Sequence, residues 1–220
     1  MLNRHGADQW IPATIVAAPI LFACAWLASK GETGWWVPFG VVLIAWTGFL
    51  AFFRDPARSI PPAADRTMLS PADGTVSAVL HQVHHEAVDG PAMVIRIYLS
   101  VLDVHVNRVP WDGRVISRTH RPGRYLDVRV DESAKVNECL LLQIDAPEGF
   151  RFGVRLVSGA VARRIACTAR PDDTLHRGDR MGMIKFGSTT ELILPAEGFE
   201  CLVKVGDRVR GGVSALARRR

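Results

Sequence analysis

Lysine, cysteine and tyrosine are all scarce in this chain of 220 residues. Only four of the 27 basic residues are lysines, and the remaining arginines favour forked contacts with phosphate or carboxylate groups. The four cysteines lie far apart and form no C-x-x-C pair, which excludes a zinc knuckle and a dithiol redox site. A Gly-X-Y repeat and a heptad repeat are also missing, so the chain is not fibrous.

Charge is sparse as well, and its distribution limits the partners. Charged residues make up 22% of the chain against 48% hydrophobic residues, which excludes a disordered protein. Arg218–Arg220 is the only basic run, and no basic stripe is interleaved with aromatic residues, so nucleic acid is not the expected partner. A net charge of +5 fits the surface of an anionic membrane better.

Two long uncharged runs occupy the N-terminal quarter of the chain. Ile11–Ala28 has no charge over 18 residues and Gly34–Phe53 has none over 20. As helices they would reach about 27–30 Å, close to the thickness of the hydrocarbon layer of a membrane. Five of the six tryptophans lie in or beside these runs, as is typical of membrane interfaces. We therefore expect residues 1–53 to form a membrane-associated helical hairpin.

The flanking arginines predict how this hairpin is oriented. Arg4 precedes the first run, and Arg54, Arg58 and Arg66 follow the second. By the positive-inside rule both ends face the cytoplasm.

Other interpretations of the two runs stay open. A cleaved signal peptide is disfavoured, because the first run is too long and a second one follows at once. Pro12, Pro19 and Pro38 would be unusual inside lipid, so a buried helix pair of a soluble core and a re-entrant insertion are alternatives.

The rest of the chain, residues 54–220, has the pattern of an antiparallel β domain. Short runs rich in valine and isoleucine alternate with Gly, Pro and Asp, and long helical periods are missing apart from one short helix around 159–164. The expected strands are Thr75–Val83, Met93–Leu99, Val104–Val109, Arg114–Arg118, Val136–Ile144, Phe152–Val157, Thr190–Leu194 and Cys201–Val205. The predicted fold class is mainly β, a sandwich or barrel-like catalytic domain preceded by the apolar helical hairpin.

A weak internal repeat supports this prediction. The segment R-G-D-R-M-G at 177–182 recurs as V-G-D-R-V-R at 205–210, and Gly-Asp after a strand indicates a turn. Lipoyl- and biotinyl-carrier-like sandwiches have hairpins of this kind. None of the four lysines lies at a hairpin tip where such a carrier would bear its cofactor.

Three short segments hold candidate functional residues. They are S-P-A-D-G at 70–74, Y-L-S-V-L-D-V-H-V-N-R at 98–108 and I-K-F-G-S-T-T at 184–190. Each is weak by itself, because Asp73-Gly74 is first of all a hairpin turn and a histidine such as His105 is more often a buried structural residue.

In this order the segments resemble a phosphatidylserine decarboxylase proenzyme of the short, bacterial, membrane-associated type. F-F-R-D-P at 52–56, R-P-G at 121–123 and V-A-R-R-I at 161–165 extend the resemblance over nearly the whole chain. It implies self-cleavage between Gly187 and Ser188 into a β chain of residues 1–187 and an α chain of residues 188–220. It also implies that Ser188 becomes a covalent pyruvoyl cofactor, at the cytoplasmic face of the bacterial inner membrane.

The residue types suit that chemistry. The Ser188 hydroxyl would attack the carbonyl of Gly187, with His105 as the base and Asp73 orienting it. Decarboxylating an amino acid requires an electron sink, and no glycine-rich phosphate loop accompanies a lysine for pyridoxal phosphate. A pyruvoyl carbonyl would instead condense with the amine of phosphatidylserine. His105 would then protonate Cα, and phosphatidylethanolamine would be released.

The resemblance leaves several points open. Arg121, Arg163 and Arg164 are the candidates for binding the lipid phosphate. Longer relatives have a second histidine where this chain has Arg108, so the division of roles between cleavage and turnover is not fixed. The sequence also leaves open whether the substrate is an acyl or an ether lipid and whether the protein forms a homo-oligomer.

Two other functions are compatible with the same residues. A membrane-anchored, non-catalytic hybrid-motif or adaptor domain would keep the 187–188 peptide intact. A membrane serine hydrolase would use Ser188, His105 and Asp73 as a triad without cutting itself. No metal site is expected, because His81, His84, His85 and Glu86 lack the H-E-x-x-H spacing.

Overall fold

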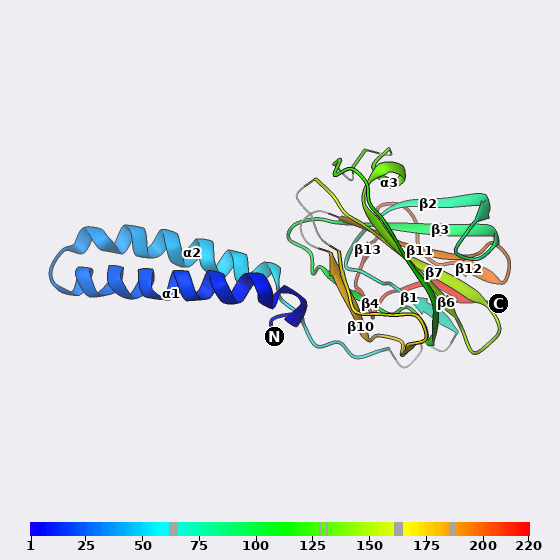
Figure 1. Ribbon diagram of the computed structural model, residues 1–220, viewed down its shortest axis with the longest axis horizontal. Coiled ribbons are helices and arrows are strands. Elements are labelled where there is room, and N and C mark those ends of the chain that lie inside the picture. The colour runs from blue at the N-terminus through cyan, green and yellow to red at the C-terminus, as the bar shows by residue number, and fades with distance from the viewer. Residues whose placement is uncertain (62–65, 128, 131, 161–164, 185–187) are drawn as a thin grey trace. The chain divides into compact units, whose positions relative to one another are not determined.

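The computed structural model of the protein describes residues 1–61, 66–127, 129–130, 132–160, 165–184 and 188–220. The chain divides into two compact units, Met1–Pro56 and Ala57–Arg220. Figure 1 shows that the first is helical and that the second consists mainly of strands.

The first unit is a pair of apolar helices. Helix α1 spans Ala7–Ser29 and helix α2 spans Trp36–Phe52, and single 3-10 turns precede them at Arg4–Gly6 and Thr33–Trp35. The short connection between the helices returns the chain, so the two run antiparallel as the sequence predicted.

Two polar contacts, at different positions along the hairpin, join its first half to its second half. The Trp46 indole N–H donates to the hydroxyl of Thr14 at 3.2 Å. Near the chain start, the backbone N–H of Asn3 donates to the carbonyl of Phe53 at 2.8 Å. These contacts pair residues far apart in the sequence and fix the register of the hairpin.

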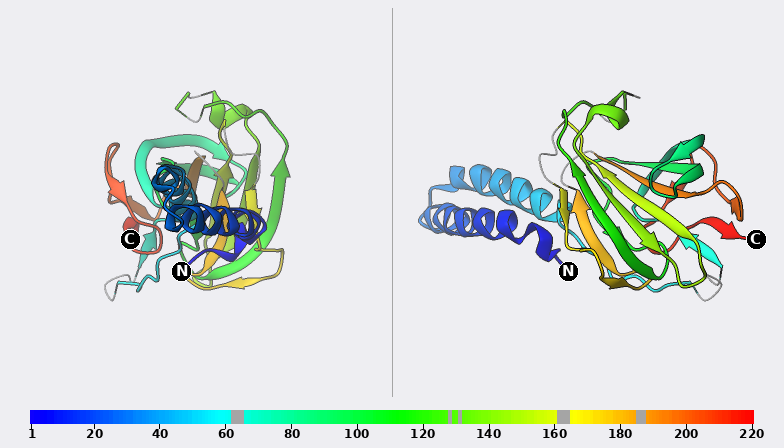
Figure 2. Two further views of the ribbon diagram at one scale, coloured as in Figure 1. Left: turned by 90° about the vertical axis from the view of Figure 1, so that its left-hand side faces the viewer. Right: turned by 45° about the vertical axis from the view of Figure 1, so that its right-hand side comes forward.

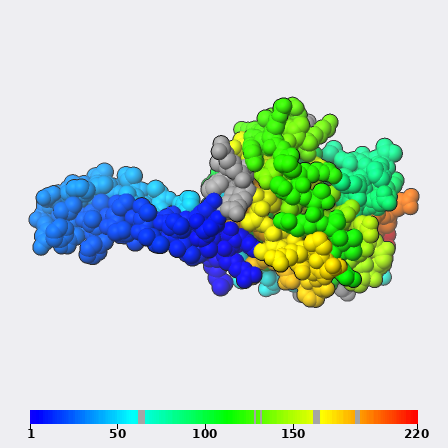
Figure 3. All heavy atoms as spheres, viewed as in Figure 1, coloured from blue at the N-terminus to red at the C-terminus, as the bar shows by residue number. Residues whose placement is uncertain are grey.

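Large apolar side chains cover the outside of this unit, which is drawn in blue in Figure 3. Phe22 and Ile44 are 73% and 74% exposed. Arg4–Ser29 and Thr33–Phe52 are long and apolar enough to cross a membrane, by length and composition. Surfaces of this kind are stable against lipid rather than water, so the unit indicates membrane association.

The described residues of the second unit form fourteen strands. They are β1 (Thr67–Leu69), β2 (Gly74–His85), β3 (Gly90–Leu99), β4 (Val106–Arg108), β5 (Gly113–Arg121), β6 (Cys139–Asp145), β7 (Arg151–Val157), β8 (Ile165–Cys167), β9 (Thr174–Leu175), β10 (Arg180–Ile184), β11 (Ser188–Pro195), β12 (Phe199–Cys201), β13 (Arg208–Val209) and β14 (Ala215–Arg219). One short helix, α3 (Ser133–Val136), precedes β6.

The strands form three antiparallel sheets. The largest has the order β13-β2-β3-β11-β7-β6-β5-β9, and its strong curl is visible in the two views of Figure 2. Two three-stranded sheets, β4-β10-β8 and β1-β14-β12, complete the unit. Strand β11 is central, because it is hydrogen bonded to β3 on one side and to β7 on the other.

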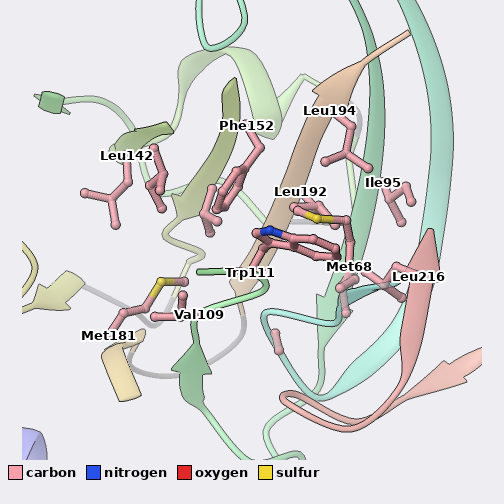
Figure 4. Packing of buried hydrophobic residues seen from close by; sticks show 14 of the residues in the cluster. Met68, Ile95, Val109, Trp111, Leu142, Phe152, Met181, Leu192, Leu194 and Leu216 are labelled. Carbon is pink, nitrogen blue, oxygen red and sulfur yellow. The ribbon is translucent and has the colours of Figure 1, made fainter. Parts of the chain in front are cut away.

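The main hydrophobic core lies on the concave side of the large sheet. Alternation along β11 shows the two faces: Leu192 and Leu194 enter this core, whereas Ile193 packs in a smaller cluster on the other face. Figure 4 shows Trp111 in the middle of the core, with Leu192 and Met68 beside it.

The repeat seen in the sequence corresponds to two turns of the same construction. In His176–Asp179 and Lys204–Asp207, the aspartate side chain accepts the backbone N–H of the first residue, at 3.3 and 2.9 Å. Both turns place glycine at positive φ, Gly178 at 87° and Gly206 at 96°. A third turn, Arg170–Asp173, has Asp172 at φ 73° in the glycine position, so a search for Gly-Asp could not find it.

The structure confirms the predicted fold class and corrects several element boundaries. The strand expected at Val136–Ile144 begins only at Cys139, because Ser133–Val136 form α3. The strand expected at Cys201–Val205 ends at Cys201, because a turn begins at Lys204. Most of the helix expected around 159–164 falls outside the described residues.

A buried ion-pair triad holds β11 between its two neighbours. Glu191 is 1% exposed, and its carboxylate oxygens lie 2.7 Å from Arg96 Nε of β3 and 2.7 Å from Arg155 Nε of β7. Arg155 also donates to the carbonyl of Ala134 in α3 at 3.0 Å. The three side chains are direct cross-strand neighbours, so the ionic contacts reinforce the backbone ladder.

Replacing Glu191 with alanine should therefore destabilise the protein strongly. The free energy of unfolding should fall by about 3 kcal/mol, because two largely buried guanidinium groups would lose their counter-charge. The matched control Glu197→Ala removes an exposed carboxylate and should change it by less than about 0.5 kcal/mol. Denaturant titration measures both, and equal small effects would contradict the role given to the triad.

Candidate active site

A tight turn before β2 holds the first candidate residue. In the turn Ser70–Gly74, the Ser70 hydroxyl donates to the carbonyl of Ala72 at 2.6 Å. The Ser70 N–H donates to the carbonyl of Ser214 at 2.7 Å, and its carbonyl accepts the N–H of Gly212 at 2.8 Å. The C-terminal segment of the chain therefore fixes the position of the turn.

The Asp73 carboxylate is held from two sides. One oxygen lies 2.7 Å from Nη2 of Arg58, and the other accepts the backbone N–H of Gly211 at 2.8 Å. The side chains of Asp73 and Arg58 are only 14% and 10% exposed. Both oxygens thus have donors, and the carboxylate has a defined orientation.

His105 follows β3 in the loop that leads into β4. Its side chain is fully buried, and Nδ1 lies 3.0 Å from the backbone carbonyl of Asp103. A carbonyl oxygen can only accept a hydrogen bond, so Nδ1 is the protonated nitrogen. The neutral ring then carries its lone pair on Nε2, which is the form of histidine that acts as a base.

Ser188 is the first residue of β11 and is fully buried. Its hydroxyl has no hydrogen-bond partner within the described part of the chain. Leaving a buried hydroxyl unsatisfied costs about 1–3 kcal/mol, and such groups in native proteins call for a functional explanation. Its burial and unsatisfied hydroxyl single out Ser188 among the candidate residues.

The strand register brings these segments to the same end of the strands β2, β3 and β11, and these strand ends form one edge of the large sheet. Thr75 near the start of β2 pairs with Tyr98 of β3, and Tyr98 pairs with Thr189 of β11. The Asp73 turn, the end of β3 and Ser188 therefore lie at the same end of three neighbouring strands.

A buried asparagine links this edge to β4. The Asn107 amide donates to the hydroxyl of Thr190 at 2.9 Å and to the carbonyl of Pro71 at 3.5 Å. Asn107 lies two residues after His105, so it connects the histidine segment to both the Asp73 turn and the start of β11.

The residues on either side of 185–187 contact one short segment of chain. The backbone N–H of Ile184 donates to the carbonyl of His105 at 3.3 Å, and Ser188 pairs with Leu99. Residues 99–105 therefore contact both flanks of the position where the sequence predicts cleavage. Gly187 itself lies outside the described residues.

Comparison with known proteins assigns the family. The family model described as phosphatidylserine decarboxylase matches residues 47–217. The chain belongs to the phosphatidylserine decarboxylase family. The resemblance identified in the sequence and the predicted enzyme class are thereby confirmed.

Individual relatives of this decarboxylase family cover most of the chain. A protein of Pelobacter propionicus is 43% identical over 77% of this chain and 76% of its own length. One of Rhodopirellula baltica is 37% identical over 98% and 87%, and one of Gluconacetobacter diazotrophicus is 40% identical over 92% of each. All three are named phosphatidylserine decarboxylase proenzyme.

Of the arginines predicted to bind phosphate, Arg121 lies at this same end of the sheet, three strands from β11, because it pairs with Cys139, Cys139 with Val157 and Val157 with Thr189. Arg121 ends β5 and forms an exposed ion pair with Glu86, whose hydrogen bond raises the pKa of the guanidinium. Arg163 and Arg164 lie outside the described residues.

Several residues at the site were missed by the sequence analysis. Asp103 orients His105 through a backbone carbonyl, so its side-chain type gave no signal for that role. Asn107 was part of the quoted motif, but its link to Thr190 depends on the fold. Arg58 was noted only for its charge, and nothing in the sequence pairs it with Asp73.

The histidines of β2 take no part in this site. His81 and His84 are exposed, whereas His85 is buried and its Nδ1 accepts the N–H of Ala87 at 3.0 Å. Burial lowers the pKa of His85, and the charge of Arg155 lowers it further. Among the described residues, no group of three or more His, Cys, Asp or Glu could hold a metal ion.

Gly74 offers a test of the Asp73 turn. Its φ of 151° is unfavourable for other residues, and an added Cβ would lie 2.1 Å from the carbonyl oxygen of Tyr98. Gly74→Ala should lower the free energy of unfolding by about 1–3 kcal/mol or more, because strain and a backbone clash add.

Gly90→Ala is the matched control for this prediction, since nothing lies within 4 Å of its added Cβ. It should change stability by less than about 0.5 kcal/mol in the same thermal or denaturant titration. A Gly74→Ala protein as stable as this control would show that the turn is not constrained as described.

Proposed function

We propose that this chain cleaves itself between Gly187 and Ser188, converts Ser188 into a pyruvoyl group and decarboxylates phosphatidylserine to phosphatidylethanolamine. The single observation that carries the proposal is the buried Ser188 hydroxyl, which has no partner among the described residues. Ser188 begins β11 and pairs with Leu99, and Ile184 on the other side of 185–187 is hydrogen bonded to His105. The names of the relatives support the same substrate and a proenzyme that matures.

Cleavage begins with attack of the Ser188 hydroxyl on the carbonyl carbon of residue 187. The peptide C–N bond breaks as the acyl group moves to oxygen, and the hydroxyl proton passes through the base to the freed amine. Loss of the Ser188 Cα proton then expels the carboxylate of residue 187 and leaves dehydroalanine at the new terminus. This tautomerises to an imine, and water replaces its nitrogen as ammonia, which yields the pyruvoyl group.

His105 is the base for these proton transfers. Its Nδ1–H is held by the carbonyl of Asp103, so the neutral ring has its basic nitrogen at Nε2. Asp73, fixed by Arg58 and Gly211 at the same end of the strands, would act in concert with His105. Attack is intramolecular, so positioning by β11 lowers its entropic cost.

Turnover uses the same residues. A pyruvoyl group at position 188 would supply an electrophilic carbonyl that accepts the electrons released when carbon dioxide leaves the substrate. Burial of Ser188 fits such a group, because a site closed to water protects a reactive carbonyl. His105 would return a proton to the substrate Cα, and Arg121, Arg163 and Arg164 are our candidates for the lipid phosphate.

The cut protein would stay in one piece. The α chain of residues 188–220 would contribute β11, which lies between β3 and β7, together with β13 and β14, which pair with β2 and β1. The ion pairs of Glu191 with Arg96 and Arg155 also join the two chains. Breaking one peptide bond therefore leaves the contacts that hold β11 unchanged.

The two apolar helices support a membrane location for this chemistry. We propose that residues 1–53 form a membrane hairpin and residues 54–220 the catalytic domain. With Arg4 before the first helix and Arg54 and Arg58 after the second, both ends lie on the cytoplasmic face of the bacterial inner membrane.

Ser188→Ala should abolish both maturation and turnover, because alanine has no nucleophile. Purified wild-type protein should release carbon dioxide and phosphatidylethanolamine from phosphatidylserine vesicles, and the variant should remain a single chain without activity. Ser77→Ala, a serine on the exposed part of β2, is the control and should mature normally. A Ser188→Ala protein that still cleaves or decarboxylates would refute the assignment.

His105→Ala should slow the loss of full-length chain by at least about 100-fold, the usual cost of removing a general base. The rate is measured by denaturing electrophoresis after expression and purification. His84→Ala removes an exposed histidine of β2 and should mature at the wild-type rate. Equal rates for the two variants would exclude His105 as the base.

A further inference from the structure

An exposed apolar tip lies next to the candidate active site. Val101 and Leu102 form the middle of the turn Ser100–Asp103, and they are 54% and 80% exposed. The turn separates Leu99, the strand partner of Ser188, from His105. Two large apolar side chains therefore project to the outside at the edge of the sheet where the site lies.

This tip differs from three other turns that have the same two hydrogen bonds. In each, the aspartate side chain at the fourth position accepts the N–H of the first residue, and the aspartate N–H donates to the first carbonyl. The middle residues of the other three are Pro-Asp, Arg-Gly and Val-Gly, which suit a solvent-exposed turn. Of the four turns, only this one has two large apolar residues in the middle.

The apolar side chains cannot turn inward without breaking the turn. Asp103 is 6% exposed, and one of its oxygens accepts the N–H of Ser100 at 2.9 Å. The other oxygen lies 2.8 Å from Nη2 of Arg208, and Nη1 of the same arginine donates to the hydroxyl of Thr75 at 3.1 Å. The tip is thus a rigid projection tied to β2 and β13.

One arginine lies at the base of the projection, and a second follows it two residues later in the chain. The Arg208 side chain is 67% exposed although it pairs with Asp103, and Arg210 is exposed two residues later. An apolar tip above exposed arginines matches a bilayer surface, where acyl chains lie below anionic headgroups.

We propose that Val101 and Leu102 insert into the surface of a lipid bilayer, so that the site meets the headgroup of a substrate still in the membrane. This inference rests on the proposed function, since a lipid decarboxylase must reach the carboxylate in the headgroup of its substrate. The occupant is the bilayer itself, and Arg208 and Arg210 would contact its phosphates.

The first test compares two substrates for the full-length protein in phosphatidylcholine nanodiscs. One is long-chain phosphatidylserine within the disc, and the other is short-chain phosphatidylserine dissolved in water. The double variant Val101→Ser, Leu102→Ser should need an about tenfold higher mole fraction of the long-chain lipid for half-maximal rate. Its turnover of the short-chain substrate should stay at the wild-type level.

Val83→Ser is the matched control, because Val83 is 91% exposed near the other end of β2. It should change neither substrate. Equal effects of the double variant on both substrates, or an effect on neither, would overturn the proposal. So would a changed native mass, which would make the tip a contact between two copies.

If the double variant does not mature, single variants decide the question. Leu102→Trp should retain the use of long-chain substrate, since tryptophan favours the interface, whereas Leu102→Ser should lose it. Indistinguishable single variants would overturn the proposal.

A second measurement does not depend on turnover. A nitroxide on Leu102→Cys in nanodiscs should collide more often with oxygen dissolved in the lipid than one on Val83→Cys. The unsubstituted chain gives the background of the four native cysteines. A label in lipid on an inactive wild-type background would contradict the proposed function and support insertion, whereas equal oxygen access at both positions would overturn insertion.

Discussion

Strand β11 is hydrogen bonded on both sides, and this fixes the position of Ser188 and of the segments around it. Its backbone pairs with β3 from Ser188 to Pro195 and with β7 from Thr189 to Ile193. Glu191 adds a buried carboxylate between Arg96 and Arg155 at the middle of these ladders. A strand held in this way cannot shift by one residue without moving a charge into the hydrophobic core.

In the proposed reaction, this constraint would let one residue serve both cleavage and turnover. Ser188 stands at the end of a fixed strand, so its position does not depend on the peptide bond that precedes it. The histidine segment is attached to the same edge through Ile184 and Leu99 on either side. Cleavage there would leave both reacting groups in place. The exposed tip of Val101 and Leu102 belongs to this same segment, so membrane contact and catalysis would share one loop.

Much of this organisation could be predicted from the sequence. Alternating apolar residues gave the strands of the large sheet, and the uncharged runs gave the helical hairpin, because both patterns follow directly from burial. Asp73, His105 and Ser188 were found through short motifs. The register of β2, β3 and β11 then brings their segments to one edge.

Other features could not be predicted, for identifiable physical reasons. The carbonyl of Asp103 orients His105, and backbone groups leave no trace in residue identity. Asp172 occupies the position that glycine has in the turns at Gly178 and Gly206, since a short polar side chain tolerates positive φ. Helix α3 is four residues long, too short for a periodic pattern. The pairing of Arg58 with Asp73 joins an irregular segment to a turn and depends on the complete fold.

Mass spectrometry of the purified wild-type protein decides whether the chain cleaves itself and converts Ser188. Under native conditions we expect one assembly that contains residues 1–187 and 188–220 in equal amounts. Under denaturing conditions we expect two chains, the smaller one beginning with a ketone in place of the amine and hydroxyl of Ser188. A single uncut chain under both conditions, with an unmodified serine at position 188, would contradict this expectation.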